Sequence, residues 1–151
     1  MRDYTKIEAW RLADDLTVAV YERTRSFPKE EVYGLTSQLR RASYSVPANI
    51  VEGASRESKK DYLHFLYIAR GSLSETQYFI HLAQRLDYLS LQEADALRKQ
   101  MKMTFACLRI EFAAGAAPPS FNANQHLVSI VRTDPIFLFL LADLAQVPDA
   151  R

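Results

Sequence analysis

The chain has 151 residues, 48% of them hydrophobic and 25% charged, with a formal net charge of +1. This composition is typical of a single globular domain, and it excludes a chain basic enough to bind nucleic acid strongly and nonspecifically as a monomer. Four glycines are few for this length, which favours long helices. The only cysteine, Cys107, excludes an intramolecular disulfide and suits a reducing compartment.

The N-terminal segment MRDYTKIEAW lacks the apolar stretch of a signal peptide. The longest apolar run, residues 136–142, is far shorter than the roughly 20 residues that a membrane-spanning helix needs. We therefore expect a cytoplasmic protein with no membrane partner.

The first predicted helix begins at Thr5, whose hydroxyl can cap the helix while Glu8 reaches back, as in a T-x-x-E capping box. Apolar side chains then recur at helical spacing through residue 20. The pattern ends at Phe27-Pro28, because the residue before a proline avoids the α-helical region.

The second predicted helix, residues 35–53, carries three stripes of side chains instead of the usual two. Its interior proline, Pro47, removes one backbone N–H, so we expect a kink there. The core stripe consists of Leu35, Leu39, Ala42, Val46, Ile50 and Gly53. The polar stripe consists of Gln38, Arg41, Ser45, Asn49, Glu52 and Arg56, and the third stripe, which is bulky and partly apolar, consists of Ser37, Arg40, Tyr44, Pro47 and Val51.

The third and fourth predicted helices have clear start signals. Ser58 with Asp61 opens the third, whose apolar side chains repeat in steps of three and four until the helix ends near residues 86–89. Ser90 with Glu93 forms a capping box for the fourth. Short links between long amphipathic helices predict an all-α fold, an up-down antiparallel four-helix bundle.

A change of composition after the fourth helix predicts the end of the bundle. Residues 115–124, GAAPPSFNAN, have the composition of a linker. We therefore assign residues 1–115 to the bundle and 116–151 to a linker and C-terminal extension. Within the extension, residues 135–147 are apolar on nearly all sides, which predicts a short helix docked on this bundle or on a neighbour's.

Catalytic and metal motifs are not supported by the spacing of the residues they need. A di-iron bundle requires Glu-x-x-His pairs, whereas this chain has a single D-x-x-H at Asp61 and His64, with His81 and His126 scattered elsewhere. The segment ARGSLSE at 69–75 lacks the second glycine of a nucleophile elbow, and there is no phosphate-binding glycine loop. Cys107 has the spacing of a small buried side chain. We expect no enzymatic activity, cofactor or small-molecule substrate; an enzyme would require a site built from several subunits.

The polar and third stripes of the second helix have two interpretations each. In the polar stripe, which includes Gln38, the spacing pairs Arg41 with Ser45, Ser45 with Asn49, Asn49 with Glu52 and Glu52 with Arg56. The stripe is therefore either a solvated face that satisfies itself, or it faces a subunit joint or a ligand. Tyr44, Pro47 and Val51 lie roughly 135° from the core stripe, so a monomer would leave them exposed and assembly would bury them. These three residues are our predicted oligomer interface.

A set of cations gathers near the second helix and the start of the third. Arginine for phosphates together with tyrosine for stacking is typical of single-stranded RNA recognition, although charged helix faces with buried tyrosines are also common. The nearby tyrosines are Tyr44, Tyr62 and Tyr67. The predicted nucleic-acid-binding residues are Arg40, Arg41, Arg56, Lys59, Lys60 and Arg70.

The segment YGLTSQLRRASYSVPANIVEG resembles a known family, together with Trp10 and Ala13 before it and YLHFLYIARGSLSE after it. The family comprises the four-helix bundle proteins encoded in intervening sequences of bacterial 23S ribosomal RNA genes, often labelled ribosomal proteins. The resemblance covers about residues 4–114 and implies a pentameric ring with a central channel and a proposed role in RNA binding. Related bundles accompany the reverse transcriptases of diversity-generating elements as nucleic-acid-binding accessory proteins. The family motif maps onto Gly34, Gln38, Arg40, Arg41, Pro47, Asn49, Glu52, Gly53 and Arg56, with no assigned catalyst; the extension after Gly115 is longer than the family usually carries.

Together these observations predict a non-enzymatic, homo-oligomeric bundle whose partner is RNA or a ribonucleoprotein, and the resemblance implies that the oligomer is a pentamer. The alternative is a protein-interaction scaffold without a nucleic-acid role. A ribosomal RNA gene or reverse-transcriptase gene beside the coding sequence would distinguish the two.

Overall fold

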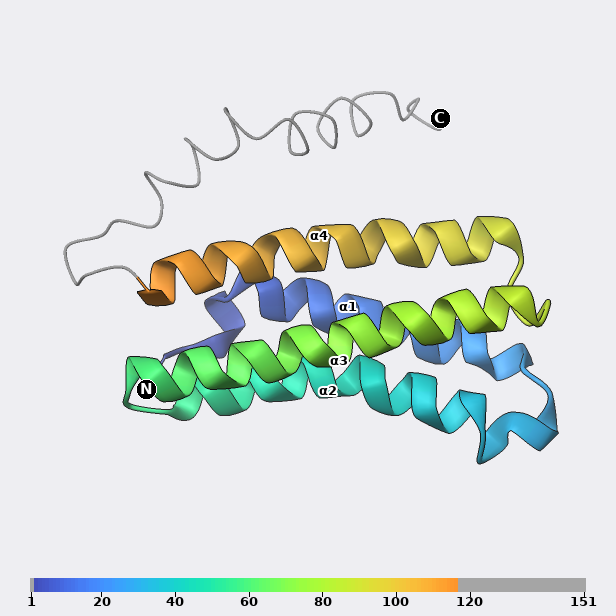
Figure 1. Cartoon of the computed structure of the whole chain (residues 1–151), viewed down its shortest axis with the longest axis horizontal. Helices are drawn as coiled ribbons and strands as arrows, with labels where there is room; N and C mark the ends of the chain where they lie inside the picture. Colours follow the sequence, from blue (N-terminus) through green and yellow to red (C-terminus); the bar gives the residue numbers. More distant parts are fainter. Residues whose placement is uncertain (1, 117–151) are drawn as a thin grey trace, which may run out of the picture. The chain divides into compact units, whose positions relative to one another are not determined.

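Four helices form the part of the chain that the computed structural model describes, residues 2–116. Each helix packs against the next, and the first also packs against the last, so the four surround one core (Figure 1). The predicted all-α four-helix bundle is confirmed for these residues, which contain no strand. The elements in order are η1 Tyr4–Lys6, α1 Glu8–Arg23, η2 Thr24–Ser26, η3 Lys29–Val32, α2 Leu35–Ser55, α3 Lys59–Arg85 and α4 Leu91–Ala116, where η marks a short 3-10 helix.

Local capping sets the starts of α3 and α4 as predicted. The Ser58 hydroxyl accepts a hydrogen bond from the backbone N–H of Asp61 at 3.0 Å. Ser90 and Glu93 form a reciprocal pair: the Ser90 hydroxyl accepts from the Glu93 N–H at 3.2 Å, and the Glu93 carboxylate accepts from the Ser90 N–H at 2.9 Å. These bonds satisfy backbone donors that the first helical turn leaves without partners.

The predicted capping box at Thr5 is wrong. Asp3, two residues earlier, accepts hydrogen bonds from both the backbone N–H and the hydroxyl of Thr5 and so starts the short helix η1. The long helix α1 begins only at Glu8, whose carboxylate binds Arg11 rather than reaching back to Thr5. The Asp3 carboxylate thus accepts from the Thr5 N–H to which Glu8 was expected to reach back, and α1 begins without a side-chain cap.

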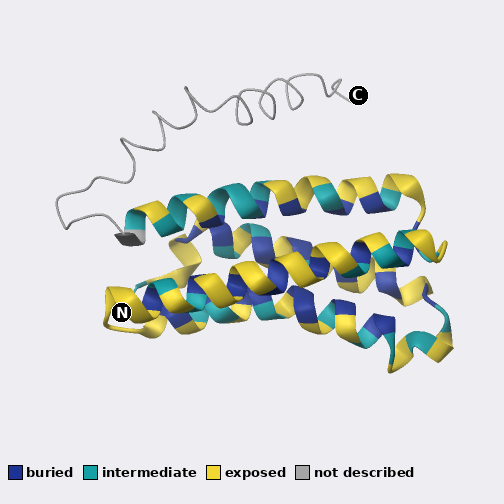
Figure 2. Cartoon of the chain, viewed as in Figure 1, coloured by how far each residue is buried: buried dark blue, intermediate teal, exposed yellow. Residues whose placement is uncertain are grey.

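The core lies along the inward faces of all four helices, where Figure 2 shows the buried residues. Every residue of the predicted core stripe of α2 is buried, including Gly53. At Gly53 a side-chain Cβ would lie 2.9 Å from the Cβ of Phe65, so α2 and α3 approach too closely there for any larger residue to fit without a shift. Cys107 is half-buried against the core.

Helix α4 continues through Ala116 and therefore includes Gly115, at which the composition predicts a linker. The predicted helix at 135–147 and His126 lie outside the described residues. The boundary between bundle and extension remains a prediction. Pro47 lies inside α2, which continues across it, and the predicted kink also remains a prediction. No helix within residues 2–116 has the length and apolarity needed to cross a membrane.

Candidate functional site

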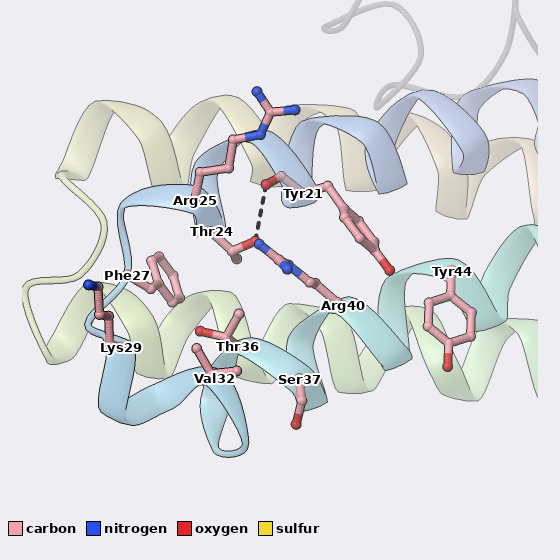
Figure 3. A pocket seen from close by; sticks show the side chains of 10 residues that line it. All are labelled: Tyr21, Thr24, Arg25, Phe27, Lys29, Val32, Thr36, Ser37, Arg40 and Tyr44. Carbon is pink, nitrogen blue, oxygen red and sulfur yellow. Dashed lines mark hydrogen bonds between the residues drawn. The ribbon is translucent and has the colours of Figure 1, made fainter.

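A cavity of about 520 Å³ opens at the end of the bundle where α1 leads into α2 (Figure 3). Its walls come from the last turn of α1, from η2 and η3, and from the first turns of α2. Arg25 and Lys29 lie at its exposed rim, and none of its lining residues is a carboxylate. Its inner wall includes Tyr21, Thr24, Phe27, Thr36, Arg40 and Tyr44.

Arg40 is held in place within this cavity by two contacts with α1 and η2. Its Nε donates a hydrogen bond to the Thr24 hydroxyl at 2.8 Å, and its guanidinium lies 4.8 Å from the centre of the Tyr21 ring. The Thr24 hydroxyl in turn donates to the Val20 carbonyl at 2.8 Å. A guanidinium has five N–H donors, so Arg40 is oriented by one of them and keeps its terminal amino groups for another partner.

Thr36 carries the only buried side-chain polar atom without a hydrogen-bond partner among the residues that the structure describes. The residue is 6% exposed and lines the same cavity. A buried hydroxyl without a partner costs free energy, and such groups in native proteins usually meet water or a ligand.

The polar stripe of α2 finds partners within its own chain. Gln38 accepts from Arg41 Nε at 3.3 Å, Asn49 donates to the Ser45 carbonyl at 2.7 Å, and Glu52 pairs with Arg56 one turn later. Arg41 also reaches Glu75 of α3, with 3.8 Å between nitrogen and oxygen. These contacts fit a solvated face, and a role at a subunit joint remains a prediction.

The six predicted nucleic-acid-binding cations do not form one cluster in a single chain. Arg40 lies in the cavity near the start of α2, whereas Arg56 lies 16 residues later, roughly 24 Å along the axis at about 1.5 Å per residue. Lys59 and Lys60 are exposed beside Arg56 at the turn into α3. Elsewhere, Arg70 lies over the rings of Tyr67 and Phe112, at 5.0 and 5.5 Å. The cations are therefore spread along the bundle.

Of the three tyrosines considered for base stacking, one is unsuitable. Tyr62 is only 2% exposed, and its hydroxyl donates to Glu111 of α4 at 2.8 Å. Burial, together with the nearby Glu111 carboxylate, raises the pKa of Tyr62. Tyr62 is thus a core residue, whereas Tyr44 and Tyr67 are 47% and 55% exposed.

The expectation that a monomer would expose Pro47 is wrong, because Pro47 is buried within the single chain. The reason is the position of α1: the hydroxyl of Thr17 donates to the carbonyl of Ser43, one turn before Pro47, so α1 covers this edge of α2. Tyr44 remains exposed and Val51 is half-buried. These two residues remain a predicted interface.

Helix α1 also has two exposed apolar residues, Val18 and Tyr21. Val18 is 54% exposed, and Tyr21, one turn later, lines the cavity together with Tyr44. Both lie off the core positions Ala13, Leu16 and Val20 of α1. Their off-core spacing is a signal that sequence analysis could have used.

Metal-ligating and reactive groups give no candidate centre. No group of three or more histidine, cysteine or carboxylate side chains is placed to hold a metal ion in the part of the chain that the structure describes. Burial raises the pKa of the Cys107 thiol to about 11, and the carboxylates of Glu8 and Glu111 add to the effect. A thiol with a raised pKa is a poor nucleophile at neutral pH.

The family model for the 23S rRNA-intervening sequence protein matches residues 5–109. The chain belongs to this family. The matched residues include the cavity, the three stripes of α2 and all six predicted nucleic-acid-binding cations. No curated protein matches the chain significantly.

A solved structure supports the fold of this family member. It is a crystal structure of a protein with unknown function from the S23 ribosomal protein family of Bacteroides thetaiotaomicron VPI-5482. The two chains share 20% identity, the match covers 69% of this chain and 97% of the other, and the TM-score is 0.62. At this identity the likeness shows the fold alone. Neither this structure nor the family description names an enzymatic activity.

Proposed function

We propose that this protein is a non-enzymatic homo-oligomer that binds RNA or a ribonucleoprotein in the cytoplasm. The observation that carries the proposal is membership of a family named for the intervening sequence of 23S rRNA, over residues 5–109. An RNA partner in or near the ribosome is the simplest activity that this name suggests. The resemblance to pentameric rings supports five copies as the assembly.

The distribution of cations and aromatic rings supports contacts along an RNA backbone. Arg70 beside the exposed Tyr67 combines a phosphate donor with a ring on which a base can stack. Arg56, Lys59 and Lys60 gather at the turn between α2 and α3. Residues 1–115 carry a net charge of only +2, but five copies would carry about +10, enough to attract a polyanion.

The exposed apolar surface of α1 and α2 supports assembly. Val18, Tyr21 and Tyr44 would remain in contact with water in an isolated chain. Burying a large apolar side chain against a neighbour contributes about 1.5–3 kcal/mol. Repeated around a closed ring, such contacts would stabilise the oligomer and place several sets of cations on one assembly.

Binding of the wild-type protein to structured ribosomal RNA fragments, measured as a function of salt, tests this function. We expect micromolar or tighter binding at low salt, weakening steeply as salt rises, with about 0.7 added to the log–log slope for each phosphate neutralised on a single strand. Arg40→Ala combined with Arg41→Ala should weaken binding to all sequences alike, because the contacts we propose for these arginines are to the RNA backbone.

The matched control is Lys99→Ala combined with Lys102→Ala, which removes the same charge from exposed positions of α4. Equal losses in the two double variants would show that only net charge matters. A wild-type protein with no salt-dependent RNA binding, together with an Arg40/Arg41 variant that dissociates, would instead support the protein-interaction scaffold.

A further inference from the structure

We propose that the cavity between α1 and α2 binds a nucleotide through its terminal phosphate monoester. The ligand is either a free nucleoside 5′-monophosphate or the 5′-phosphorylated end of an RNA strand, and the second source rests on the proposed RNA-binding function. This site differs from the spread cations proposed above for backbone contacts, since of those only Arg40 lies within it.

The charges around the cavity favour a dianion. Arg25, Lys29 and Arg40 line it without any carboxylate, and within residues 2–116 neither Arg25 nor Lys29 forms an ion pair. A phosphate monoester carries about −1.5 to −2 charges at neutral pH, whereas an internal phosphodiester carries one. Three cations therefore match a terminal phosphate better than a chain phosphate.

Arg40 is prepared for this role before any ligand arrives. Its contacts with Thr24 and Tyr21 fix the guanidinium, so little side-chain freedom is lost when its remaining donors bind phosphate oxygens. Arg25 and Lys29 are exposed, and Figure 3 shows their ends turned away from the centre. Both would swing inward over the bound phosphate.

The Thr36 hydroxyl supplies an independent sign of a missing partner. It is buried, belongs to a residue that lines the same cavity, and lacks any hydrogen bond among the described residues. A phosphate oxygen or a ribose hydroxyl would satisfy it. The start of α2 itself is already capped, because the Glu31 carboxylate accepts from the Leu35 N–H at 2.7 Å, so the site depends on side chains and not on the helix terminus.

The remaining walls suit a base. Phe27, Val32 and Tyr44 supply aromatic and apolar surface next to the cations, and bases stack favourably on such rings. The volume of about 520 Å³ is within the usual range for a small-molecule pocket of about 300–1,000 Å³. The cavity therefore has room for one nucleotide.

The test compares two short single-stranded RNAs of identical sequence, one 5′-phosphorylated and one with a 5′-hydroxyl, and adds AMP and UMP as free ligands. We expect the phosphorylated strand to bind about tenfold or more tightly than its partner, and free nucleotides to compete for the difference. Binding of AMP or UMP without a preference between the two RNAs would assign the site to free nucleotides.

Thr36→Val is the most informative variant, because it removes the hydroxyl while keeping the shape. It should weaken binding of the phosphorylated ligand about tenfold and leave the melting temperature unchanged or higher, since the hydroxyl has no partner to lose. Thr76→Val is the matched control: the Thr76 hydroxyl is buried and donates to the Ser72 carbonyl, so this variant should lower the melting temperature without changing nucleotide affinity.

Variants that remove positive charge from the cavity provide a second test of the proposal. Arg25→Gln with Lys29→Gln should abolish the preference for the 5′-phosphate, while Lys99→Gln with Lys102→Gln should keep it. Equal affinity of the wild-type protein for both RNAs, with no binding of AMP or UMP, would overturn this inference and leave the proposed function intact. Nucleotide binding without any binding of RNA fragments would overturn the proposed function and leave this inference intact. A change of oligomeric mass in Arg25→Gln/Lys29→Gln, with nucleotide affinity unaltered, would identify the cavity as a subunit joint and overturn the inference.

Discussion

Helix α2 is packed differently along its two sides. Toward α3 the packing is complete: Gly53 allows close approach of Phe65, and the Ser72 hydroxyl donates to the Ser45 hydroxyl at 3.0 Å. Toward α1, Tyr44 remains exposed beside a cavity that is also lined by Thr36, whose buried hydroxyl has no partner among the described residues. Within a single chain, the side of α2 that faces α3 is therefore fully packed. The side that faces α1 keeps the exposed surface and the cavity at which we propose that partners bind.

The largest effect is expected when a negative charge is introduced on the side of α2 that faces α1. Tyr44→Asp would place a carboxylate where we propose that a neighbouring subunit packs, and the lost burial is worth about 1.5–3 kcal/mol per side chain. Light scattering should show a lower mass, while circular dichroism keeps its helical signal.

Because Tyr44 also lines the cavity, Val18→Asp provides a second variant, at an exposed apolar position of α1 outside the cavity. Tyr78→Asp, at an exposed position of α3, is the control and should leave the mass unchanged. A wild-type protein that is monomeric at micromolar concentration would refute the assembly.

Adding a single methyl group at Gly53 tests how tightly α2 packs against α3. Gly53→Ala should lower the free energy of unfolding by about 1–3 kcal/mol, because its Cβ would meet Phe65 and the backbone oxygen of Tyr62. Gly71→Ala is the matched control: the same methyl meets nothing within 4 Å on α3, and alanine is the better helix former by up to about 1 kcal/mol. Denaturant unfolding measures the free energy of unfolding of both variants. If both alanines changed this free energy in the same direction, the tight packing of α2 against α3 at Gly53 would be contradicted.

The hydrogen bond between α3 and α4 predicts an effect no larger than the upper limit for Gly53→Ala. Tyr62→Phe removes the donor to Glu111 and should destabilise the fold by about 1.5–3 kcal/mol at most, the range for a hydrogen bond to a charged group. Tyr67→Phe alters an exposed tyrosine and should change stability by less than about 0.5 kcal/mol. Thermal unfolding of the two variants measures the difference, and equal stabilities would show that the Tyr62 hydroxyl contributes nothing.

Local signals made most of the fold predictable. The spacing of apolar residues located all four helices, and the capping pairs at Ser58 and Ser90 lie within one turn of the donors they satisfy. The capping box predicted at Thr5 was wrong for an equally local reason, because the Asp3 carboxylate accepts from the Thr5 N–H that Glu8 was expected to bind. The prediction that a monomer would expose Pro47 was wrong because the angle of a residue on a helical wheel does not tell which neighbouring helix covers it.

The cavity could not be predicted from helical spacing, since it forms where the end of α1 and the start of α2 meet across the turn between them. Arg40 is oriented by Thr24, 16 residues earlier, across the turn that contains η2 and η3. In the sequence, Thr36 is an ordinary polar residue in the first turn of a helix. Only the three-dimensional structure shows that its hydroxyl is buried without a partner among the described residues. Sequence analysis therefore named Arg40 as a cation without recognising its position, and it missed Arg25, Lys29 and Thr36 altogether.

The last prediction concerns Cys107, which is half-buried on α4. Burial raises its pKa to about 11, above the ordinary value of 9.0, so the reactive thiolate at neutral pH is reduced on the order of 100-fold. Alkylation of the folded protein should be slower than that of the denatured protein by about this factor. Because the folded pKa is the higher one, the contribution of the thiol to stability is complete below pH 9 and is lost as the pH rises toward 11. Cys107→Ala should flatten the fall in melting temperature over this window, and an alkylation rate equal to that of a free thiol would show that the side chain is accessible.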